Sequence, residues 1–256
     1  MAVELLIIPC LADNYAYVVH EAATDTTTVI DVPEAPPVLK ALNERGWKAN
    51  LILLTHHHAD HIDGVQALSA ATGAKIVGAK ADAHRLPKLD QEVSPGEKLA
   101  IGMEHVEVLP ADGHTVGHIA YYFPEGGLLF SGDSLMSWGC GRLFEGSAQQ
   151  MYDTLSRFSE LPDETLVCSG HEYTEANGRF ALSIEPENPD LLARMENVRA
   201  IRAQARPTVP VELGLEKATN PFLRGDDPKL RAALGLPESA TPVEVFTEAR
   251  ARKDRF

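Results

Sequence analysis

The 256-residue sequence has few cysteines, no long apolar segment and a deficit of positive charge. Its three cysteines, Cys10, Cys140 and Cys168, lie far apart and form no CxxC pair. This pattern disfavours a disulfide scaffold and predicts a protein of the reducing cytoplasm. No apolar run approaches the roughly 20 residues of a membrane-spanning helix, so we expect no membrane partner. Residues 1–8 are apolar but lack a basic segment, which predicts a first strand rather than a signal peptide.

The charge balance is strongly negative. Lys and Arg together number 23, Asp and Glu 37, and the formal net charge is −14. Binding to nucleic acid requires a basic surface, so nucleic acid is not an expected partner. An anionic substrate would need a local group of basic side chains set against the overall charge. The apolar fraction of 44% is that of an ordinary globular chain, long enough for one large core and a small second domain.

The composition changes near residue 175. Before that point, short β-branched segments predict strands, whereas the remainder of the chain has helical patterns. Asn188-Pro189 is typical of a helix start, and Thr241-Pro242-Val243-Glu244 has the pattern of a capping box. We therefore predict one domain at 1–172, which contains the strands, and a helical domain at 173–256. The expected strands are 5–8, 15–19, 28–30, 51–54, 75–77, 105–109, 120–123, 128–130 and 166–168, with helices at 36–43, 151–161 and after residue 61.

A histidine-rich run follows the predicted strand at 51–54. In His56-His57-His58-Ala59-Asp60-His61, His56 and His58 are two positions apart, so they point the same way in extended backbone and could bind one metal ion. Asp60 and His61 follow at the expected start of a helix and can face a second ion. Imidazole nitrogens and carboxylate oxygens suit Zn²⁺, Mn²⁺ or iron. The run therefore predicts a metal site.

Three later segments repeat the arrangement of a strand followed by a ligand-type residue in a loop with glycine. His114 follows the strand at 105–109, Asp133 the strand at 128–130, and His171 the strand at 166–168. We expect four strand ends to bring the candidate ligands to one rim of the fold. These are His56, His58, Asp60, His61, His114, Asp133 and His171.

The other histidines are interpreted as structural, because a single histidine is more often structural than a metal ligand. His57 lies between two candidate ligands and is expected to point away from the metals. His118 is expected to form a hydrogen bond near the loop of His114. The same structural interpretation applies to His20, His84 and His105.

Residues 55–61 (THHHADH) resemble the signature of the metallo-β-lactamase superfamily, and the three later candidates follow in the order that superfamily uses. Within it, the sequence closely resembles the hydroxyacylglutathione hydrolases, the glyoxalase II family. The narrower resemblance rests on 139–146 (GCGRLFEG), 169–174 (SGHEYT) and 220–224 (NPFLR). It extends over nearly the whole chain, including the helical tail.

The resemblance implies an α+β fold, namely an αβ/βα sandwich of two sheets with a small helical C-terminal domain. It implies two divalent metal ions, with zinc expected and iron or manganese as alternatives. It also implies a small-molecule partner, S-D-lactoylglutathione, hydrolysed to glutathione and D-lactate in the second step of methylglyoxal detoxification. The implied ligand sets are His56, His58 and His114 for one ion, Asp60, His61 and His171 for the other, and Asp133 between them. Asp133 and Asp60 are the implied catalytic residues, Asp60 by orienting the attacking hydroxide.

The implied glutathione contacts are Arg142, Tyr173, Arg250 and Lys253. Arg250 and Lys253 are three positions apart, so they share one face of the predicted last helix. Without the resemblance, basic residues at a helix C-terminus would be interpreted as a solvated end favoured by the helix dipole. Phe144 stands where some members of the family have tyrosine, so the hydroxyl contact to glutathione is absent.

Three other functions share parts of this pattern. A persulfide dioxygenase of the same superfamily would use a single iron, whereas the sequence has residues for two ions and a helical tail. A nuclease of the superfamily is disfavoured by the net charge of −14. A non-catalytic binding protein would be expected to have lost ligands, and the sequence retains all of them. We expect a monomer.

Overall fold

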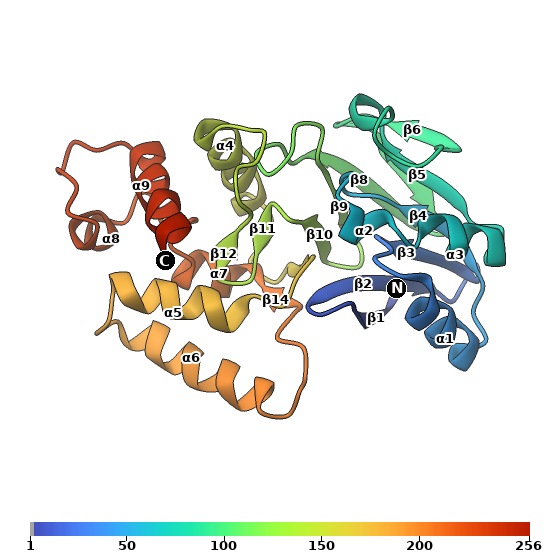
Figure 1. The fold of residues 1–256 in the computed structure, drawn as a ribbon, viewed down its shortest axis with the longest axis horizontal. Coiled ribbons are helices and arrows are strands. Elements are labelled where there is room, and N and C mark those ends of the chain that lie inside the picture. The colour runs from blue at the N-terminus through green and yellow to red at the C-terminus, as the bar shows by residue number, and fades with distance from the viewer. Residues whose placement is uncertain (1–2) are drawn as a thin grey trace. The chain divides into compact units, whose positions relative to one another are not determined.

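The structure is a computed structural model that describes residues 3–256 (Figure 1). It comprises two compact units. Unit 1 extends to Ala111 and resumes over Val116–Gly132, and unit 2 contains Asp112–Thr115 and Asp133–Phe256. None of the helices described in this range has the length and apolarity of a segment that crosses a bilayer.

Unit 1 is built on a six-stranded sheet with the order β1-β2-β3-β4-β5-β6. The pairs β1–β2 and β2–β3 are antiparallel, whereas β3, β4, β5 and β6 run parallel. Parallel strands end at the same edge of a sheet, so β3 and β4 bring the residues that follow them to one place. The strands are β1 (Val3–Cys10), β2 (Asn14–Glu21), β3 (Thr26–Ile30), β4 (Ala49–Leu53), β5 (Lys75–Ala79) and β6 (Gln91–Val93).

Helices α1 (Ala35–Arg45) and α3 (Val65–Thr72) cover one face of this sheet (Figure 1). The core between these helices and the sheet includes the buried side chains Val38, Leu42, Ile52, Val65 and Leu68. Burial of one aliphatic side chain contributes roughly 1.5–3 kcal/mol to the stability of the fold, so this core is the main attachment of the helices to the sheet.

The helix expected after the histidine run is divided into two. The short α2 covers Ala59–Ile62, and α3 begins after Gly64. A Cβ atom on Gly64 would lie 2.7 Å from the backbone nitrogen of Ala35, so glycine is required where α3 starts against α1. The apolar spacing predicted the buried face correctly, but it did not predict this break.

The remaining strands of unit 1 form an antiparallel ladder in the order β10-β9-β8-β7. The strands predicted at 105–109, 120–123 and 128–130 are confirmed. The ladder contains β7 (Lys98–Ile101), β8 (Glu104–Pro110), β9 (Ile119–Phe123) and β10 (Leu128–Gly132), and a 3-10 turn at Lys80–Asp82 lies between β5 and β6 in the chain.

A pair of carboxyl groups lies where β8 begins. Glu104 is buried and is hydrogen-bonded to Glu125. Burial, followed by the contact with Glu125, raises the pKa of Glu104, whereas backbone hydrogen bonds lower the pKa of Glu125. A proton shared by the two carboxyl groups would therefore be held more tightly by Glu104 than by Glu125.

We expect Glu104→Gln to stabilise the protein at pH 8. The pKa of Glu104 is higher in the folded state than in the unfolded state. The stability contributed by protonated Glu104 is therefore complete below the unfolded-state pKa, and it is lost as the pH rises through the folded-state pKa. A glutamine amide donates to Glu125 at every pH, so the gain should be about 1 kcal/mol at pH 8 and should shrink toward pH 5. Thermal unfolding at both pH values measures it. A gain that is the same at both values would contradict the shared proton.

Unit 2 is mainly helical, and Figure 1 shows α5 and α6 side by side within it. As predicted, Asn188 caps α6 by accepting from the backbone of Asp190 at 3.1 Å, and Thr241 opens α9 with a capping box to Glu244. Its helices are α4 (Ala148–Ser159), α5 (Thr174–Ile184), α6 (Pro189–Arg202), α7 (Leu213–Thr219), α8 (Pro228–Ala233) and α9 (Pro242–Arg255). Its strand pairs are β11 (Leu135–Met136) with β12 (Gly139–Cys140), and β13 (Leu166–Ser169) with β14 (Val211–Glu212).

Candidate metal centre

The histidine run lies in unit 1 immediately after β4. His56 is completely buried, and His58, the last residue before α2, is half-buried. The ring centroid of His56 is 4.8 Å from that of His58 and 4.2 Å from that of His61 in α2. Three imidazoles predicted as ligands are thus gathered at the end of β4.

Asp31, which follows β3, connects two of these imidazoles. Its Oδ2 accepts the hydroxyl proton of Thr55 at 2.7 Å and lies 2.9 Å from Nδ1 of His61. Because Thr55 has already donated its only hydroxyl proton, the 3.0 Å contact between Thr55 Oγ1 and His56 Nδ1 makes His56 the donor. An ionised carboxylate only accepts, so His61 Nδ1 is also protonated. Both rings therefore carry their lone pair on Nε2.

Asp31 was not among the residues predicted for the site. It is 3% exposed and has a φ of 52°, a left-handed conformation that costs most side chains about 1–2 kcal/mol. A residue keeps this left-handed conformation where neighbouring groups hold it in place, often at a functional site. The strand-end pattern that identified Asp133 also occurs here, because Asp31 directly follows a predicted strand.

Asp60 is held by a side chain of β2. Asn14 donates from Nδ2 to Asp60 Oδ2 at 2.9 Å and to the Asp60 backbone oxygen at 3.0 Å. Asn14 is buried, so these contacts fix the direction in which the half-exposed carboxylate points.

His57 and His118 have other contacts in unit 1. His57 Nδ1 lies 2.9 Å from Oδ2 of the buried Asp82, in agreement with the expectation that it is turned away from the ligands. The backbone oxygen of His118 accepts from Ala111, and its ring stacks on His56 with centroids 4.6 Å apart. The ring of His118 therefore supports a candidate ligand directly. Sequence reasoning did not predict this contact.

His114, Asp133 and His171 come together within unit 2, and each is at most 5% exposed. Asp133 Oδ2 is 3.5 Å from Nε2 of His114 and 3.3 Å from Nε2 of His171. His114 Nδ1 lies 2.8 Å from the backbone carbonyl oxygen of Arg142, which can only accept. In its neutral form, His114 would direct a lone pair at a carboxylate oxygen, an arrangement that a cation between the two would stabilise.

The donor atoms therefore fit divalent metal ions. In His56, His61 and His114, a protein oxygen binds Nδ1 and leaves Nε2 to coordinate, which is the usual arrangement of a metal-binding histidine. Imidazole nitrogen combined with carboxylate oxygen suits zinc, iron and manganese.

The chain passes between the units at residues 111/112, 115/116 and 132/133. Two of these crossings flank His114, and the third directly precedes Asp133. His114 and Asp133 thus follow segments of unit 1 closely in the chain.

Two of the predicted substrate residues adjoin the candidate ligands of unit 2. Arg142 is exposed, and its backbone oxygen binds His114. The ring of Tyr173 stacks on His171, with centroids 4.7 Å apart and an interplanar angle of 9°. Phe144 is 62% exposed and meets the ring of His114 at 5.2 Å.

Arg250 of α9 is buried rather than presented to solvent. It is 4% exposed, donates to the backbone oxygen of Cys140 at 3.0 Å and pairs with Asp254 at 2.8 Å. Its contact with Cys140 also fixes the end of β12. Whether Arg250 binds substrate stays a prediction.

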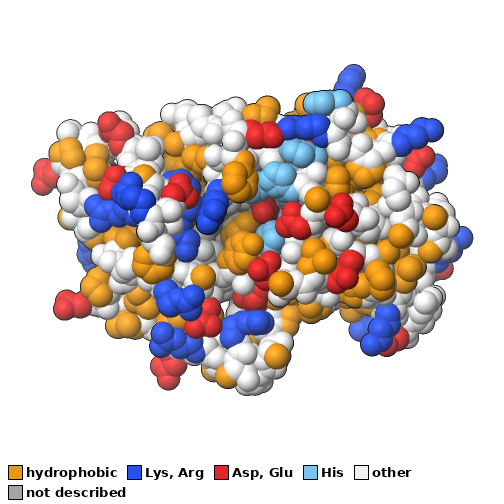
Figure 2. Space-filling model, in the orientation of Figure 1, with side chains coloured by type: hydrophobic (Ala, Val, Ile, Leu, Met, Phe, Trp, Pro, Cys, Tyr) orange, Lys and Arg blue, Asp and Glu red, His pale blue; other side chains and the backbone are white. Residues whose placement is uncertain are grey.

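Lys253 is half-buried on the same face of α9 and donates to the backbone oxygen of Ala176 at 3.3 Å. Burial, followed by the positive charges of Arg250, Arg179 and Arg142, lowers its pKa from 10.5 to about 8. Figure 2 shows Lys and Arg side chains gathered over this part of unit 2. Arg179 was not predicted to lie near Lys253, because nothing in its local sequence marks it.

Comparison with known proteins identifies the family. The sequence model of the metallo-β-lactamase superfamily matches residues 14–171, and that of the hydroxyacylglutathione hydrolase C-terminus matches residues 172–256. A hydroxyacylglutathione hydrolase of Rhodobacter capsulatus is 66% identical over 256 residues, which is 100% of both chains. The chain belongs to the hydroxyacylglutathione hydrolase family. It is therefore a metal-dependent hydrolase, and the family recognised from the sequence is confirmed.

Solved structures confirm the fold of this hydrolase. The BLEG-1 B3 metallo-β-lactamase is similar with a TM-score of 0.67 and 22% identity, covering 86% of this chain and 100% of that one. The protein TTHA1623, solved in a di-iron-bound form, has a TM-score of 0.62 and 27% identity over 86% of this chain and 100% of that one. The predicted metallo-β-lactamase fold of two sheets with a helical C-terminal domain is thus correct.

Proposed function

We propose that this hydrolase cleaves S-D-lactoylglutathione to glutathione and D-lactate, in the cytoplasm and as a monomer. The observation that carries the proposal is the 66% identity over the full length, because the matched region includes the ligand loops and the basic face of α9. The helical 173–256 segment would bind glutathione, and residues 1–172 would supply the metal centre. The change of family model between residues 171 and 172 supports this division.

We further propose that the site holds two divalent ions. His56, His58 and His114 would bind one, Asp60, His61 and His171 the other, and Asp133 both. The contacts of Asp133 Oδ2 with His114 and His171 support its bridging position. The di-iron form of TTHA1623 supports the number of ions, and zinc, iron and manganese all suit the donors.

When bound, such ions acidify a water molecule and stabilise negative charge on the carbonyl oxygen of a thioester. The protein's own groups supply position. The Asn14 amide fixes the Asp60 carboxylate, which would orient the attacking oxygen. Asp31 and Thr55 hold two imidazoles in the tautomer that coordinates. The leaving thiolate has a free pKa near ~8.5, so no strong general acid is required.

We propose Arg142, Tyr173, Arg250 and Lys253 as the glutathione contacts. Glutathione carries two carboxylates, and Lys253 lies among three arginines in a protein with a net charge of −14. Gathering like charges is unfavourable by itself, so this arrangement favours binding of an anion.

The affinity for substrate should decrease between pH 7 and 9. Lys253 binds a carboxylate in its charged form, and its pKa of about 8 means that this form is lost between pH 7 and 9. We therefore expect kcat/KM for S-D-lactoylglutathione to decrease by about tenfold over that range, through KM. The pH profile of kcat/KM reports groups of the free enzyme and measures this.

Two substitutions control this prediction. Lys253→Met should have a raised KM at pH 7 and no such decrease, whereas Lys253→Arg should keep the charge and move the decrease to higher pH. An unchanged profile in Lys253→Met would remove Lys253 from the substrate site.

Turnover and metal content measured together test the proposed function. Purified protein is given S-D-lactoylglutathione, and loss of the thioester absorbance is followed. About two ions per chain with rapid turnover is the expected result. One iron per chain with consumption of oxygen on glutathione persulfide would instead indicate the mononuclear-iron persulfide dioxygenase, which the relationship to the hydrolases disfavours.

A further inference from the structure

The turn Ser137-Trp138 joins β11 to β12, and both strands lie between Asp133 and Arg142 in the chain. Trp138 has a φ of 62° and a fully buried side chain. Residues with a Cβ atom seldom adopt this left-handed conformation, and they keep it where neighbouring groups hold it.

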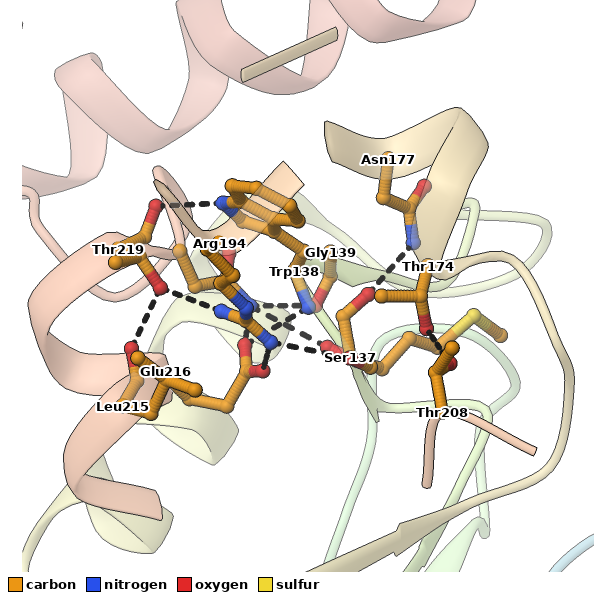
Figure 3. Close-up of polar contacts among 12 residues, drawn as sticks. Ser137, Trp138, Gly139, Thr174, Asn177, Arg194, Thr208, Leu215, Glu216 and Thr219 are labelled. Carbon is orange, nitrogen blue, oxygen red and sulfur yellow. Dashed lines mark hydrogen bonds and ion pairs between the residues drawn. The ribbon is translucent and has the colours of Figure 1, made fainter. Parts of the chain in front are cut away.

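Helices α5 and α7 hold the turn through its backbone and its indole (Figure 3). The backbone N–H of Trp138 donates to Oε2 of Glu216 at 2.8 Å, and its indole Nε1 donates to the backbone oxygen of Thr219 at 3.0 Å. Asn177 Nδ2 donates to the backbone oxygen of Ser137 at 3.0 Å. The conformation of the turn is thus imposed by helices distant from it in the sequence.

Arg194 of α6 connects these contacts. Its Nη2 donates to Ser137 Oγ at 3.1 Å, its guanidinium lies 4.5 Å from the ring centroid of Trp138, and it forms an ion pair with Glu216. The side chains of Arg194 and Glu216 are only 4% and 0% exposed. Apolar residues often replace a buried ion pair with no loss of stability, so stability alone does not account for this one.

The turn is linked to the ligands at both ends of its hairpin. Gly141 N–H donates to the backbone oxygen of Ser134 at 3.2 Å, directly after Asp133. A Cβ atom on Gly141 would lie 2.0 Å from the Asp133 backbone oxygen, so the segments that flank the hairpin are closely packed. The next residue, Arg142, supplies the carbonyl that orients His114. A displaced turn would therefore displace both Asp133 and the oxygen that fixes His114.

We propose that the ion pair Arg194–Glu216 positions Asp133 and His114 through the Ser137-Trp138 turn. Arg194 and Glu216 act as positioning residues, because they contact the turn and not the reacting groups. The inference rests on the proposed function for the role of Asp133 and His114 as metal ligands. The helical segment would thus determine metal geometry in addition to binding substrate.

The test compares Glu216→Gln with Glu185→Gln. An amide in place of Glu216 points an N–H group at either Arg194 or the Trp138 N–H, so either the ion pair or the hydrogen bond to the turn is lost. Glu185 is the matched control, because it pairs with Arg224 in the same unit, their side chains are only 10% and 8% exposed, and it lies outside the group that holds the turn. Both variants are loaded with cobalt, and cobalt absorption, release to a chelator, Tm, kcat and KM are measured.

Both variants should lose a similar amount of Tm. Only Glu216→Gln should release cobalt about 10–100-fold faster, as expected when a partner of a metal ligand is disturbed, with an altered cobalt spectrum and a lower kcat at unchanged KM. Release and spectrum equal to those of Glu185→Gln would overturn the proposal. A wild type that does not hydrolyse the thioester would refute the proposed function and leave the cobalt comparison intact.

If Glu216→Gln does not fold, Ser137→Ala decides the question. It removes the hydrogen bond from Arg194 to the turn and leaves the ion pair and the contact of Arg194 with the Trp138 ring in place. Ser183→Ala in α5, which loses a hydroxyl contact to Phe180, is its control. Faster cobalt release from Ser137→Ala than from Ser183→Ala supports the proposal, and equal release overturns it.

Discussion

Replacing Asp133 by alanine should reduce kcat for S-D-lactoylglutathione by about 10³-fold, because loss of several kcal/mol of stabilisation by the ions costs tenfold per 1.4 kcal/mol. Asp133 Oδ2 lies 3.5 Å from Nε2 of His114 and 3.3 Å from Nε2 of His171. Without the carboxylate, no negative charge remains between the two imidazoles. Metal analysis and steady-state kinetics of Asp133→Ala measure the effect.

Asp153→Ala is a suitable control for this substitution. Asp153 is an exposed carboxylate of α4 in the same unit, hydrogen-bonded to Gln149 at 2.7 Å. It should retain wild-type metal content and kcat. An Asp133→Ala protein with full metal content and a kcat within tenfold of wild type would contradict the assignment of Asp133.

Replacing Asp31 by asparagine should reduce metal affinity by about 10²-fold, although Asp31 is not itself a proposed ligand. If the amide N–H₂ group faces Thr55 Oγ1 and His61 Nδ1, the hydroxyl reverses and donates to His56. Both imidazoles then carry their proton on Nε2 and cannot coordinate. If the amide is turned round, its N–H₂ group instead faces the backbone N–H of Thr55, which now donates to Asp31 Oδ1 at 2.9 Å. Neither orientation satisfies the contacts.

Asp82→Asn tests whether this effect depends on the ligands. Asp82 is fully buried and contacts Nδ1 of His57, the residue next to His56. Asp82→Asn therefore makes the same change in charge and shape as Asp31→Asn, but beside a histidine that is not a candidate ligand. It should lower Tm and leave metal affinity unchanged. Equal metal loss in Asp31→Asn and Asp82→Asn would show that the tautomer argument is wrong. Equilibrium competition with a chelator measures both variants.

Sequence patterns predicted the strands that precede the candidate ligand loops correctly, because the physical signal is local. A buried apolar strand followed by a loop residue with a nitrogen or oxygen donor is visible within ten positions, as at 51–61 and 128–133. The caps of α6 and α9 are equally local, since Asn188 and Thr241 bind backbone groups two and three residues away. These parts of the fold could be predicted without tertiary contacts.

The supporting contacts could not be predicted in this way, because they join residues far apart in the chain. Asp31 meets His61 across 30 positions, and Glu216 meets Trp138 across 78. Arg250 illustrates the same limit. At a helix C-terminus its sequence is typical of a solvated end, whereas the structure buries it against Cys140, 110 positions away. Burial of a charge depends on partners that sequence spacing does not reveal.

The two tryptophans of the chain provide an intrinsic fluorophore in each unit. Trp47 in unit 1 stacks on His20 with ring centroids 4.2 Å apart, and Trp138 in unit 2 lies under Arg194. Trp47→Phe and Trp138→Phe therefore leave emission from one unit at a time. Denaturation curves of the two variants would coincide if the units unfold as one cooperative structure and separate if they do not. Repeating them with and without metal would measure how much bound metal stabilises each unit.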